Sequence, residues 1–450
     1  MTYNNATKYV KNAPESHIGD HSAERLAYLF SKLDEPQKRL RYIRLAGTNG
    51  KTICKAMIAS VLSESGYTAC ELTLTPLSDV RNNILVNREP LEIAEFTTLI
   101  QTVSELAIEL KKQIERAKAE LSEAETLEGD AAKLPEALIT ANDAAVLTQS
   151  EILLLAAIIY AKKHRLDLTV IESKGDADPS LCLPAPFAAV ICGAIPSNDT
   201  RQIMRIKNYI KRGTNEIVSA PDDPLSYKAI SDTCAAINCR LSVPVRSSLT
   251  LKQLSLLGTR FVYANEEYRL SLCGRFQTTN AITAIETFKL LRRHGFNISL
   301  SAEKKGLEKV KVPARFEVLS LLPTIIADST YKSEAVETVC ESLFDFSEIT
   351  GREIALCLPV DAELIKKYFE MLSARGYKIC ELFTVCDNEE TKESLLVSLP
   401  QLTQLTFAKN AKALTKLMAE KASTERILLI SGPSAFASAI RLEVIRKLQF

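Results

Sequence analysis

The chain has 450 residues, of which 46% are apolar and 25% are charged, and its formal net charge is +1. This length accommodates two or three domains, and the composition is that of an ordinary globular protein. A charge so close to zero gives no reason to expect nucleic acid or an anionic membrane as a partner. The first residues lack a basic-then-apolar signal, and the longest apolar run, Ile152 to Ala161, is too short to cross a bilayer. We therefore expect a cytoplasmic protein and a monomer.

The first strong signal along the chain is a glycine-rich turn between a short strand and a helix. An apolar strand over Tyr42–Leu45 leads into the turn, and a helical pattern continues over Ile53–Ser65. Backbone N–H groups of such a turn point at phosphate oxygens, a lysine neutralises the phosphate charge and a threonine hydroxyl reaches Mg²⁺. An incidental glycine turn is the alternative, but strand, turn and helix all fall where a nucleotide site needs them. The predicted nucleotide-binding residues of this turn are Gly47, Thr48, Asn49, Gly50, Lys51 and Thr52.

Beyond this turn, strand-like runs alternate with helical ones, which predicts an α/β fold with mainly parallel sheets. The expected strands are Tyr42–Leu45, Leu168–Glu172, Ala188–Cys192, Ile325–Ala327, Glu353–Leu358, Leu382–Val385 and Arg426–Ile430. A small antiparallel patch is expected near Leu241–Leu272. The eleven cysteines form no CxxC pair, and several lie in apolar runs, which predicts buried, reduced thiols and no metal–thiolate site.

Two stretches suggest how the domains are arranged. Residues 106–147 are rich in Ala, Glu and Lys, and we interpret them as a solvent-exposed helical excursion with a loop, outside the core. A linker is expected near Gly295–Lys311. The predicted domains are a P-loop NTPase-like central domain over 1–296 and a smaller, Rossmann-like α/β domain over 297–450.

The turn Gly47–Thr52 is similar to the signature of the Mur ligase superfamily. Further stretches resemble one branch of it, the folylpolyglutamate synthase/dihydrofolate synthase family, in the same order and over nearly the whole chain except 106–147. These stretches are Thr73–Leu77, Arg81–Leu91, Val170–Glu172, Gly274–Ala281, Pro313–Glu317, Ile326–Asp328 and Arg426–Ser434. The chain resembles a divergent member of that family.

The resemblance implies an ATP-dependent, ADP-forming ligase that joins a carboxylate to an amine through an acyl phosphate, as in the addition of glutamate to a folate. The implied partners are a small-molecule acid and an amino acid, and the implied cofactors are ATP and Mg²⁺. Such chemistry needs positioned reactants, neutralised phosphate charge and hard oxygen ligands for the metal.

The resemblance also assigns roles to residues, and for several of them a purely structural explanation is the alternative. The catalytic positions are Lys51, Glu172 and Lys207. The implied Mg²⁺ ligands are Thr52, Thr75 and Glu172, and Asp199 is a further candidate because it offers an oxygen where the family has a histidine. The implied nucleoside contacts are Asn280, Arg315 and Asp328, the last two supplied by the second domain on closure. Thr75 is equally consistent with a turn, Glu172 with a solvated charge, and Arg315 with Asp328 as a surface ion pair.

The chain departs from the family in the part that would hold a second metal ion. Where the family has a metal-binding histidine, this chain has Asn198 and Asp199, and none of its four histidines occupies a family metal or catalytic position. Lys207 is several residues short of the spacing of the family's carbamylated lysine, so a solvated helix lysine is its alternative. The family's His-Asn motif is replaced by Tyr331-Lys332, and Leu77-Ser78 replace the histidine of the folate loop.

Three functions are compatible with this pattern. The first is a divergent ligase with an altered metal shell or a different acid, and the second is a nucleotide-binding pseudoenzyme with a regulatory or subunit role. The third, a simple P-loop ATPase or kinase, is weaker because Glu172 is the nearest equivalent of a Walker B acid. The sequence identifies neither the acid nor the amine.

Overall fold

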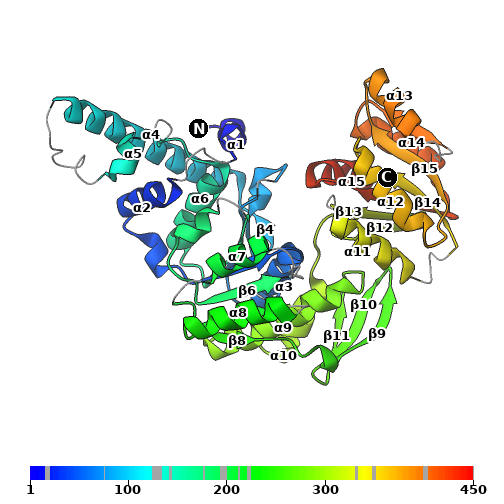
Figure 1. Ribbon diagram of the computed structural model, residues 1–450, viewed down its shortest axis with the longest axis horizontal. Helices are drawn as coiled ribbons and strands as arrows, with labels where there is room; N and C mark the ends of the chain where they lie inside the picture. Colours follow the sequence, from blue (N-terminus) through cyan, green and yellow to red (C-terminus); the bar gives the residue numbers. More distant parts are fainter. Residues whose placement is uncertain are drawn as a thin grey trace. The chain divides into compact units, whose positions relative to one another are not determined.

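A computed structural model shows an α/β protein (Figure 1). It describes residues 1–15, 21–75, 77–123, 134–140, 144–175, 178–192, 200–210, 213–219, 224–329, 333–346, 351–398 and 404–448. The chain divides into two compact units: Met1–Pro244 with Ile282–Gly306, and Val245–Ala281 with Leu307–Phe450. The segment expected as a linker, Gly295–Lys311, contains a helix, and the domain boundary at residue 297 stays a prediction.

The first unit is built on an eight-stranded sheet with the order β4-β3-β2-β5-β1-β6-β7-β8. The six strands from β2 to β8 in that order run parallel, and β3 and β4 add an antiparallel edge. The central strands are buried along their length, as expected for a parallel sheet covered on both faces. The strands are β1 (Tyr42–Gly47), β2 (Ala69–Thr73), β3 (Ile84–Val86), β4 (Glu89–Pro90), β5 (Leu168–Glu172), β6 (Ala188–Cys192), β7 (Glu216–Ser219) and β8 (Arg240–Ser242).

Ten described α-helices belong wholly or partly to this unit; α9 begins in the second unit and α10 ends in it. They are α1 (Tyr3–Asn12), α2 (Ser22–Lys32), α3 (Lys51–Glu64), α4 (Ile93–Glu123), α5 (Glu136–Thr140), α6 (Gln149–His164), α7 (Thr200–Tyr209), α8 (Pro224–Ala236), α9 (Phe276–Arg293) and α10 (Leu300–Lys309). None of the described helices is long and apolar enough to cross a membrane.

The interpretation of 106–147 as an excursion outside the core is wrong. Helix α4 runs without a break to Glu123, and its apolar side chains recur every three or four residues and are buried in the core of the first unit. The buried apolar side chains of this stretch are Ala107, Leu110, Ile114, Ala117, Leu134, Leu138, Ile139, Ala144 and Leu147. The charged residues between them lower the average apolar fraction of the stretch, but they lie on the other faces of the helix and do not interrupt its apolar stripe.

Helix α3, which follows the glycine-rich turn, packs closely on α10. The hydroxyl of Ser60 donates to the carbonyl of Gly306 at 2.7 Å. A Cβ at Gly306 would lie 2.6 Å from the Cα of Val61, so only glycine allows this approach. This contact, together with the packing of α3 on β1, β2, β5 and β6, helps to position the turn at the start of α3.

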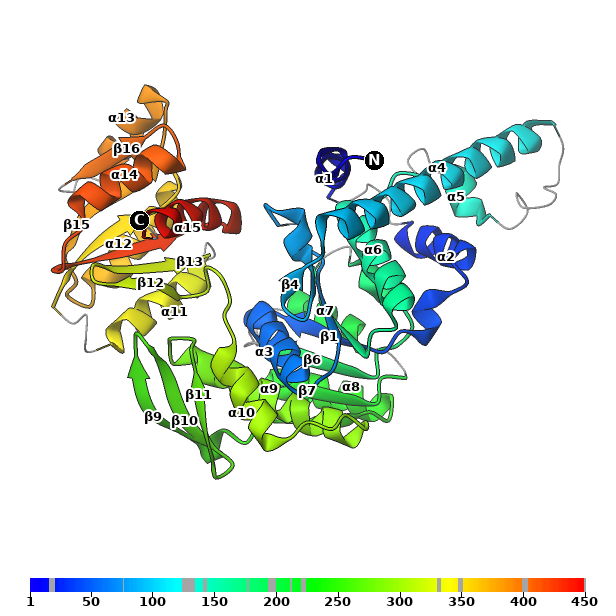
Figure 2. The same cartoon turned by 180° about the vertical axis from the view of Figure 1, so that it is seen from behind.

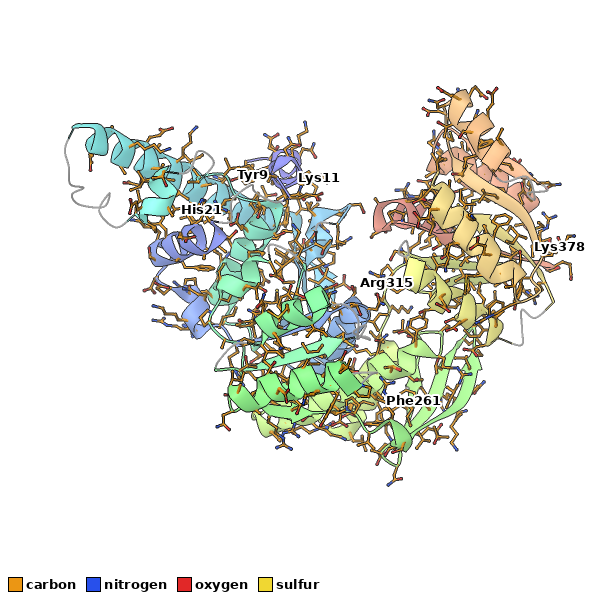
Figure 3. The ribbon with its side chains drawn as sticks, in the orientation of Figure 1. Tyr9, Lys11, His21, Phe261, Arg315 and Lys378 are labelled. Carbon is orange, nitrogen blue, oxygen red and sulfur yellow. The ribbon has the colours of Figure 1, made fainter. Side chains whose placement is uncertain are left out.

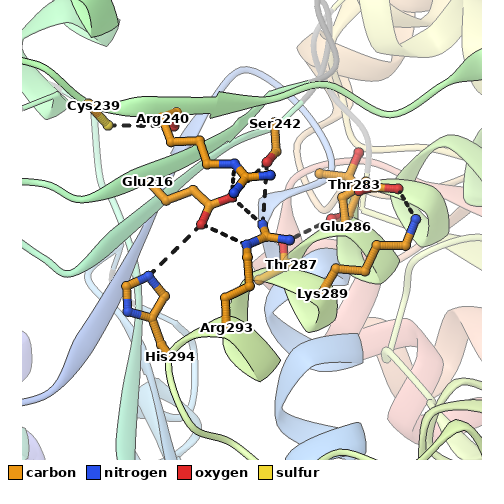
Figure 4. Close-up of polar contacts among 10 residues, drawn as sticks. All are labelled: Glu216, Cys239, Arg240, Ser242, Thr283, Glu286, Thr287, Lys289, Arg293 and His294. Atoms are coloured by element: carbon orange, nitrogen blue, oxygen red, sulfur yellow. Dashed lines mark hydrogen bonds and ion pairs between the residues drawn. The ribbon is translucent and has the colours of Figure 1, made fainter.

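A buried carboxylate holds α9 against the far strands of the same sheet (Figure 4). Glu216 is 3% exposed and forms an ion pair with Arg293. It also accepts from the hydroxyl of Ser242 at 2.7 Å and lies within 3.6 Å of the Arg240 guanidinium. These contacts are remote in sequence, and no local pattern predicts them.

The second unit contains two sheets. The strands β9 (Leu249–Ser255), β10 (Gly258–Tyr263) and β11 (Glu266–Leu270) form a three-stranded antiparallel sheet, which confirms the antiparallel patch. A six-stranded sheet has the order β12-β13-β17-β14-β15-β16, with only β12 antiparallel to its neighbour. Its strands are β12 (Glu317–Leu321), β13 (Thr324–Asp328), β14 (Glu353–Cys357), β15 (Ile379–Val385), β16 (Leu405–Ala408) and β17 (Arg426–Ser431).

Helices cover both faces of this six-stranded sheet, as in a Rossmann-like domain (Figure 2). Alternate strand residues point to opposite faces. Ile326 and Leu356 pack with α11 and α12, whereas Ile325 and Ala355 pack with α14 and α15. The helices are α11 (Ser333–Phe344), α12 (Ala362–Ser373), α13 (Glu389–Ser398), α14 (Ala411–Lys421) and α15 (Ser434–Leu448). The predicted parallel α/β fold, with its smaller second α/β domain, is confirmed.

Candidate functional site

The glycine-rich turn is held tightly against strand β6. Gly47 ends β1 with a φ of +115°, and a Cβ there would lie 2.0 Å from the carbonyl oxygen of Cys192. The amide of Thr48 donates to that same oxygen at 3.2 Å. Position 47 therefore requires glycine for both its backbone conformation and its close approach to β6.

Helix α3 begins directly after this turn. Gly50 is its N-cap, with a φ of +84°, and offers no side chain to cap the helix. The N–H groups of a first helical turn have no intrahelical acceptor, and the positive end of the helix dipole lies there. This combination makes the turn an anion-binding element.

Two side chains of the first turn of α3 lie as a phosphate and metal site would need them. The ammonium of Lys51 donates to the carbonyl of Gly47 at 2.7 Å, so this side chain folds back over the glycine-rich turn. The hydroxyl of Thr52 donates to Oε1 of Glu172 at 2.7 Å. Lys51, Thr52 and Glu172 are therefore brought together, as the sequence predicts.

Glu172 is brought there by the strand order. It is the last residue of β5, where its register partners are Leu45 of β1 and Thr73 of β2. The carboxyl ends of these parallel strands share one edge of the sheet, at which open α/β sheets bind their ligands. Glu172 is 8% exposed, so it is not the solvated charge that was its alternative.

A buried lysine that the sequence analysis missed pairs with this carboxylate. The ammonium of Lys55 lies 2.7 Å from Oε2 of Glu172, and Lys55 is 4% exposed. Burial alone would raise the pKa of Glu172, but the charge and hydrogen bond of Lys55, with contributions from Lys51 and Thr52, lower this pKa to about 2. The carboxylate is therefore ionised at neutral pH. The available signal was the spacing of Lys51 and Lys55, which places both on one face of α3.

The hydroxyl nearest this pair comes from Thr73 and not from Thr75. Thr73 accepts a hydrogen bond from Lys55 and lies 3.4 Å from Oε2 of Glu172. Thr75 is exposed, and its carbonyl accepts from the amide group of Asn83 at 2.8 Å. The metal-binding role of Thr75 stays a prediction.

The other predicted residues of the first unit are less informative. Lys207 is partly exposed near the end of α7, and no side-chain partner is found for it among the described residues. Asn198 and Asp199, the residues at the position of the family's histidine, lie outside the described residues, as do Tyr331 and Lys332. No group of three His, Cys, Asp or Glu side chains within the described ranges is arranged to hold a metal ion.

In the second unit, Asp328 is hydrogen-bonded to the backbone of Phe316, the residue after Arg315. Asp328 ends β13, is 4% exposed and accepts from the amide of Phe316 at 2.7 Å, so it is not half of a surface ion pair. Arg315, labelled in Figure 3, is half-buried in the segment that leads into β12. Asn280, in α9, is 9% exposed and donates to the side chain of Gln277 at 3.2 Å.

The oxygens of Thr52 and Glu172 fit a magnesium ion. Hydroxyl and carboxylate oxygens are the ligands that Mg²⁺ prefers, and Mg²⁺ bound with ATP takes few protein ligands, because phosphate oxygens and water complete its shell. These two oxygens are 2.7 Å apart, next to the turn that would hold the phosphates. This fit depends only on residues of the first unit.

Comparisons with known proteins show which proteins this chain is similar to. No protein-family model matches the chain. The dihydrofolate synthase/folylpolyglutamate synthase of Bacillus subtilis is 24% identical over 439 residues, which cover 93% of both chains. The crystal structure of folylpolyglutamate synthase from Thermotoga maritima has a TM-score of 0.77 at 19% identity and covers 98% of this chain and 96% of that one. A folylpolyglutamate synthase in complex with AMPPCP and folate has a TM-score of 0.72 at 19% identity, covering 98% and 99% of the two chains.

Proposed function

We propose that this chain, a divergent relative of the folylpolyglutamate synthases, is an ATP-dependent ligase that joins a carboxylic acid to the amine of an amino acid. The observation that carries the proposal is the joint position of the glycine-rich turn, Lys51, Thr52 and Glu172 at one sheet edge. Relatives of full length that are named folylpolyglutamate synthases, one of them in complex with an ATP analogue and folate, support the same activity.

In this proposal the chain's own residues position and neutralise the phosphates. The N–H groups of Gly47–Thr52 and the ammonium of Lys51 hold the triphosphate of ATP. Mg²⁺, held by Thr52 and Glu172, would neutralise phosphate charge. A carboxylate oxygen of the acid attacks the γ-phosphorus and ADP leaves. The amine then attacks the acyl carbon of the acyl phosphate, and inorganic phosphate leaves as the amide forms.

The remaining assignments are part of the same proposal. Asn280, Arg315 and Asp328 contact the nucleoside, and Thr75, Lys207 and Asp199 are candidates for the metal shell and catalysis. The burial of Asp328 and its bond to the backbone of Phe316 support a structured loop around Arg315. Arg315→Ala is expected to weaken ATP binding without changing the circular dichroism spectrum.

The acid is proposed to be a folate or a compound of similar size, and the amine to be glutamate. Turnover on ordinary dihydrofolate is expected to be slow, because the family's second-metal histidine is absent and the folate loop has Leu77-Ser78. Losing one preorganised electrostatic contact typically costs roughly 10²–10³ in rate. None of the comparisons supports the pseudoenzyme alternative.

The test is release of phosphate from Mg-ATP by the purified protein, screened against folates with glutamate and against other acid and amino-acid pairs. We expect release that requires both an acid and an amine, with Lys51→Ala as the inactive control. Turnover on dihydrofolate on the order of 10 s⁻¹ would contradict the slow-folate expectation but not the ligase. ATP binding without release for any pair would overturn the ligase in favour of the pseudoenzyme.

A further inference from the structure

Beneath the glycine-rich turn lies a lysine that the proposed reaction does not use. Lys55 follows Lys51 by one helical turn in α3 and is 4% exposed. Lysine is almost never buried to this extent unless its charge is paired, because removing an ammonium from water costs free energy. The contacts of Lys55 therefore show which negative charge its ammonium neutralises.

The partner of Lys55 is the proposed metal-binding carboxylate. Its ammonium lies 2.7 Å from Oε2 of Glu172 and also donates to the hydroxyl of Thr73. The other buried carboxylate nearby, Glu71, has its own cation, since Nη1 of Arg88 lies 2.6 Å from Oε2 of Glu71. Lys55 is thus committed to Glu172 and Thr73.

The two oxygens of Glu172 serve two different sides of the site. Oε1 accepts from the hydroxyl of Thr52 at 2.7 Å, on the side of the glycine-rich turn. Oε2 accepts from Lys55 at 2.7 Å, with the Thr73 hydroxyl 3.4 Å away. A carboxylate and a hydroxyl are the kind of oxygens that a divalent cation binds, and on the Oε2 side an ammonium already holds both.

A second divalent ion on the Oε2 side would meet two obstacles. It would lie within a few ångströms of the buried Lys55 ammonium, where like charges repel strongly because little water screens them. It would also need further ligands, and the described part of the chain brings no three His, Cys, Asp or Glu side chains together to supply them.

We infer that the Lys55 ammonium is a resident cation of the phosphate site, which holds Oε2 of Glu172 and the Thr73 hydroxyl in place of a second divalent ion. One divalent ion then accompanies the nucleotide, on the side of Thr52 and Oε1. Lys55 acts through Glu172 and is a positioning residue. The inference rests on the proposed nucleotide site for the identity of the bound phosphates.

The experiment is equilibrium dialysis of the full chain against Mn²⁺ and AMPPCP, with both measured on each side of the membrane. The excess in the protein compartment gives the number of Mn²⁺ ions bound per bound nucleotide, without any turnover. We expect about one for the unmodified chain and about one for Lys55→Arg, which keeps the charge. We expect about two for Lys55→Ala, which opens the Oε2 side.

Two results would overturn the inference alone: two Mn²⁺ ions per nucleotide in the unmodified chain, or one in Lys55→Ala. If Lys55→Ala does not fold, Lys55→Gln, which removes the charge but keeps a hydrogen-bond donor, carries the same expectation. If the protein compartment holds no excess of nucleotide, the proposed function is overturned together with the inference, so the two failures are distinguishable. Lys162→Ala, a change at an exposed lysine paired with Asp34, is the matched control and should keep a ratio of one.

Discussion

Replacing Lys55 by alanine should destabilise the first unit far more than replacing an exposed lysine. The change leaves Glu172 ionised and buried without its Lys55 partner, with only the hydroxyls of Thr52 and Thr73 as side-chain donors among the described residues. Removing one partner of a buried ion pair costs about 3–5 kcal/mol. The pKa of Glu172, which Lys55 helps to lower to about 2, points in the same direction. We expect a loss of about 3 kcal/mol in the free energy of unfolding, the lower end of that range.

The assay is urea unfolding followed by far-ultraviolet circular dichroism, because the chain contains no tryptophan for fluorescence. It is carried out with a chelator, so that no metal ion replaces the lost charge. With a slope of about 3 kcal/mol per molar urea, the midpoint should fall by about 1 M. The control Lys162→Ala removes a pair with an exposed Asp34 and should change stability by less than about 1 kcal/mol. Equal midpoints for the two variants would refute the reasoning.

The pH dependence of stability provides a second, independent test of the ion pair between Lys55 and Glu172. Because the folded pKa of Glu172 is lowered, its ionisation stabilises the fold above the ordinary carboxyl pKa of 4.5, and this stability is lost as pH falls from there towards about 2. The stability difference between the unmodified chain and Glu172→Gln should therefore shrink over that range. A difference that stays constant from pH 6 to pH 3 would show that the ion pair does not cause it.

Three further substitutions, with Gly66→Ala as a comparison for one of them, test the turn and its support. Lys51→Ala should abolish ATP binding in a calorimetric titration while the circular dichroism spectrum is unchanged, and equal affinities would remove the nucleotide from this turn. Gly47→Ala should cost at least about 2 kcal/mol, because its Cβ would overlap a backbone carbonyl. Gly66→Ala, where φ is +81° but no atom lies within 4 Å, should cost less. Gly306→Ala should destabilise the first unit, because the new Cβ would lie 2.6 Å from the Cα of Val61. This clash should outweigh the preference of a helix for alanine over glycine, which is about 1 kcal/mol. A Gly306→Ala variant more stable than the unmodified chain would refute the close packing of α3 on α10.

The sequence predicts those parts of the fold that depend on the pattern of neighbouring residues. The strands around Leu168–Glu172 and Ala188–Cys192 have those bounds in the structure, because fully buried parallel strands appear as continuous apolar runs. The turn at Gly47–Thr52 is equally predictable, since its glycines and its lysine lie within one short segment of the sequence. The helical stretch before Glu123 was misjudged because average composition hid a buried stripe.

The pairing of Lys55 with Glu172 and Thr73 could not be predicted in the same way. It depends on the order β2-β5-β1, which brings the ends of three strands from different parts of the chain to one place. Alternation of strands and helices predicts parallel strands, but it does not give their order across the sheet. From sequence alone Lys55 is one more charged residue on a helix, and only the register shows that it faces a carboxylate.

The strand register that brings Lys55 to Glu172 makes this one carboxylate important both for the stability of the sheet edge and for the proposed metal binding. Glu172 is ionised because Lys55 neutralises it, and only the ionised form offers Oε1 to a metal ion beside Thr52. A change at Lys55 therefore alters the charge available to the nucleotide and the stability of the sheet edge that positions it. Because the Lys55 ammonium is covalently attached and already in place, this part of the site is preorganised before any ligand binds, whereas a second metal ion would have to be recruited.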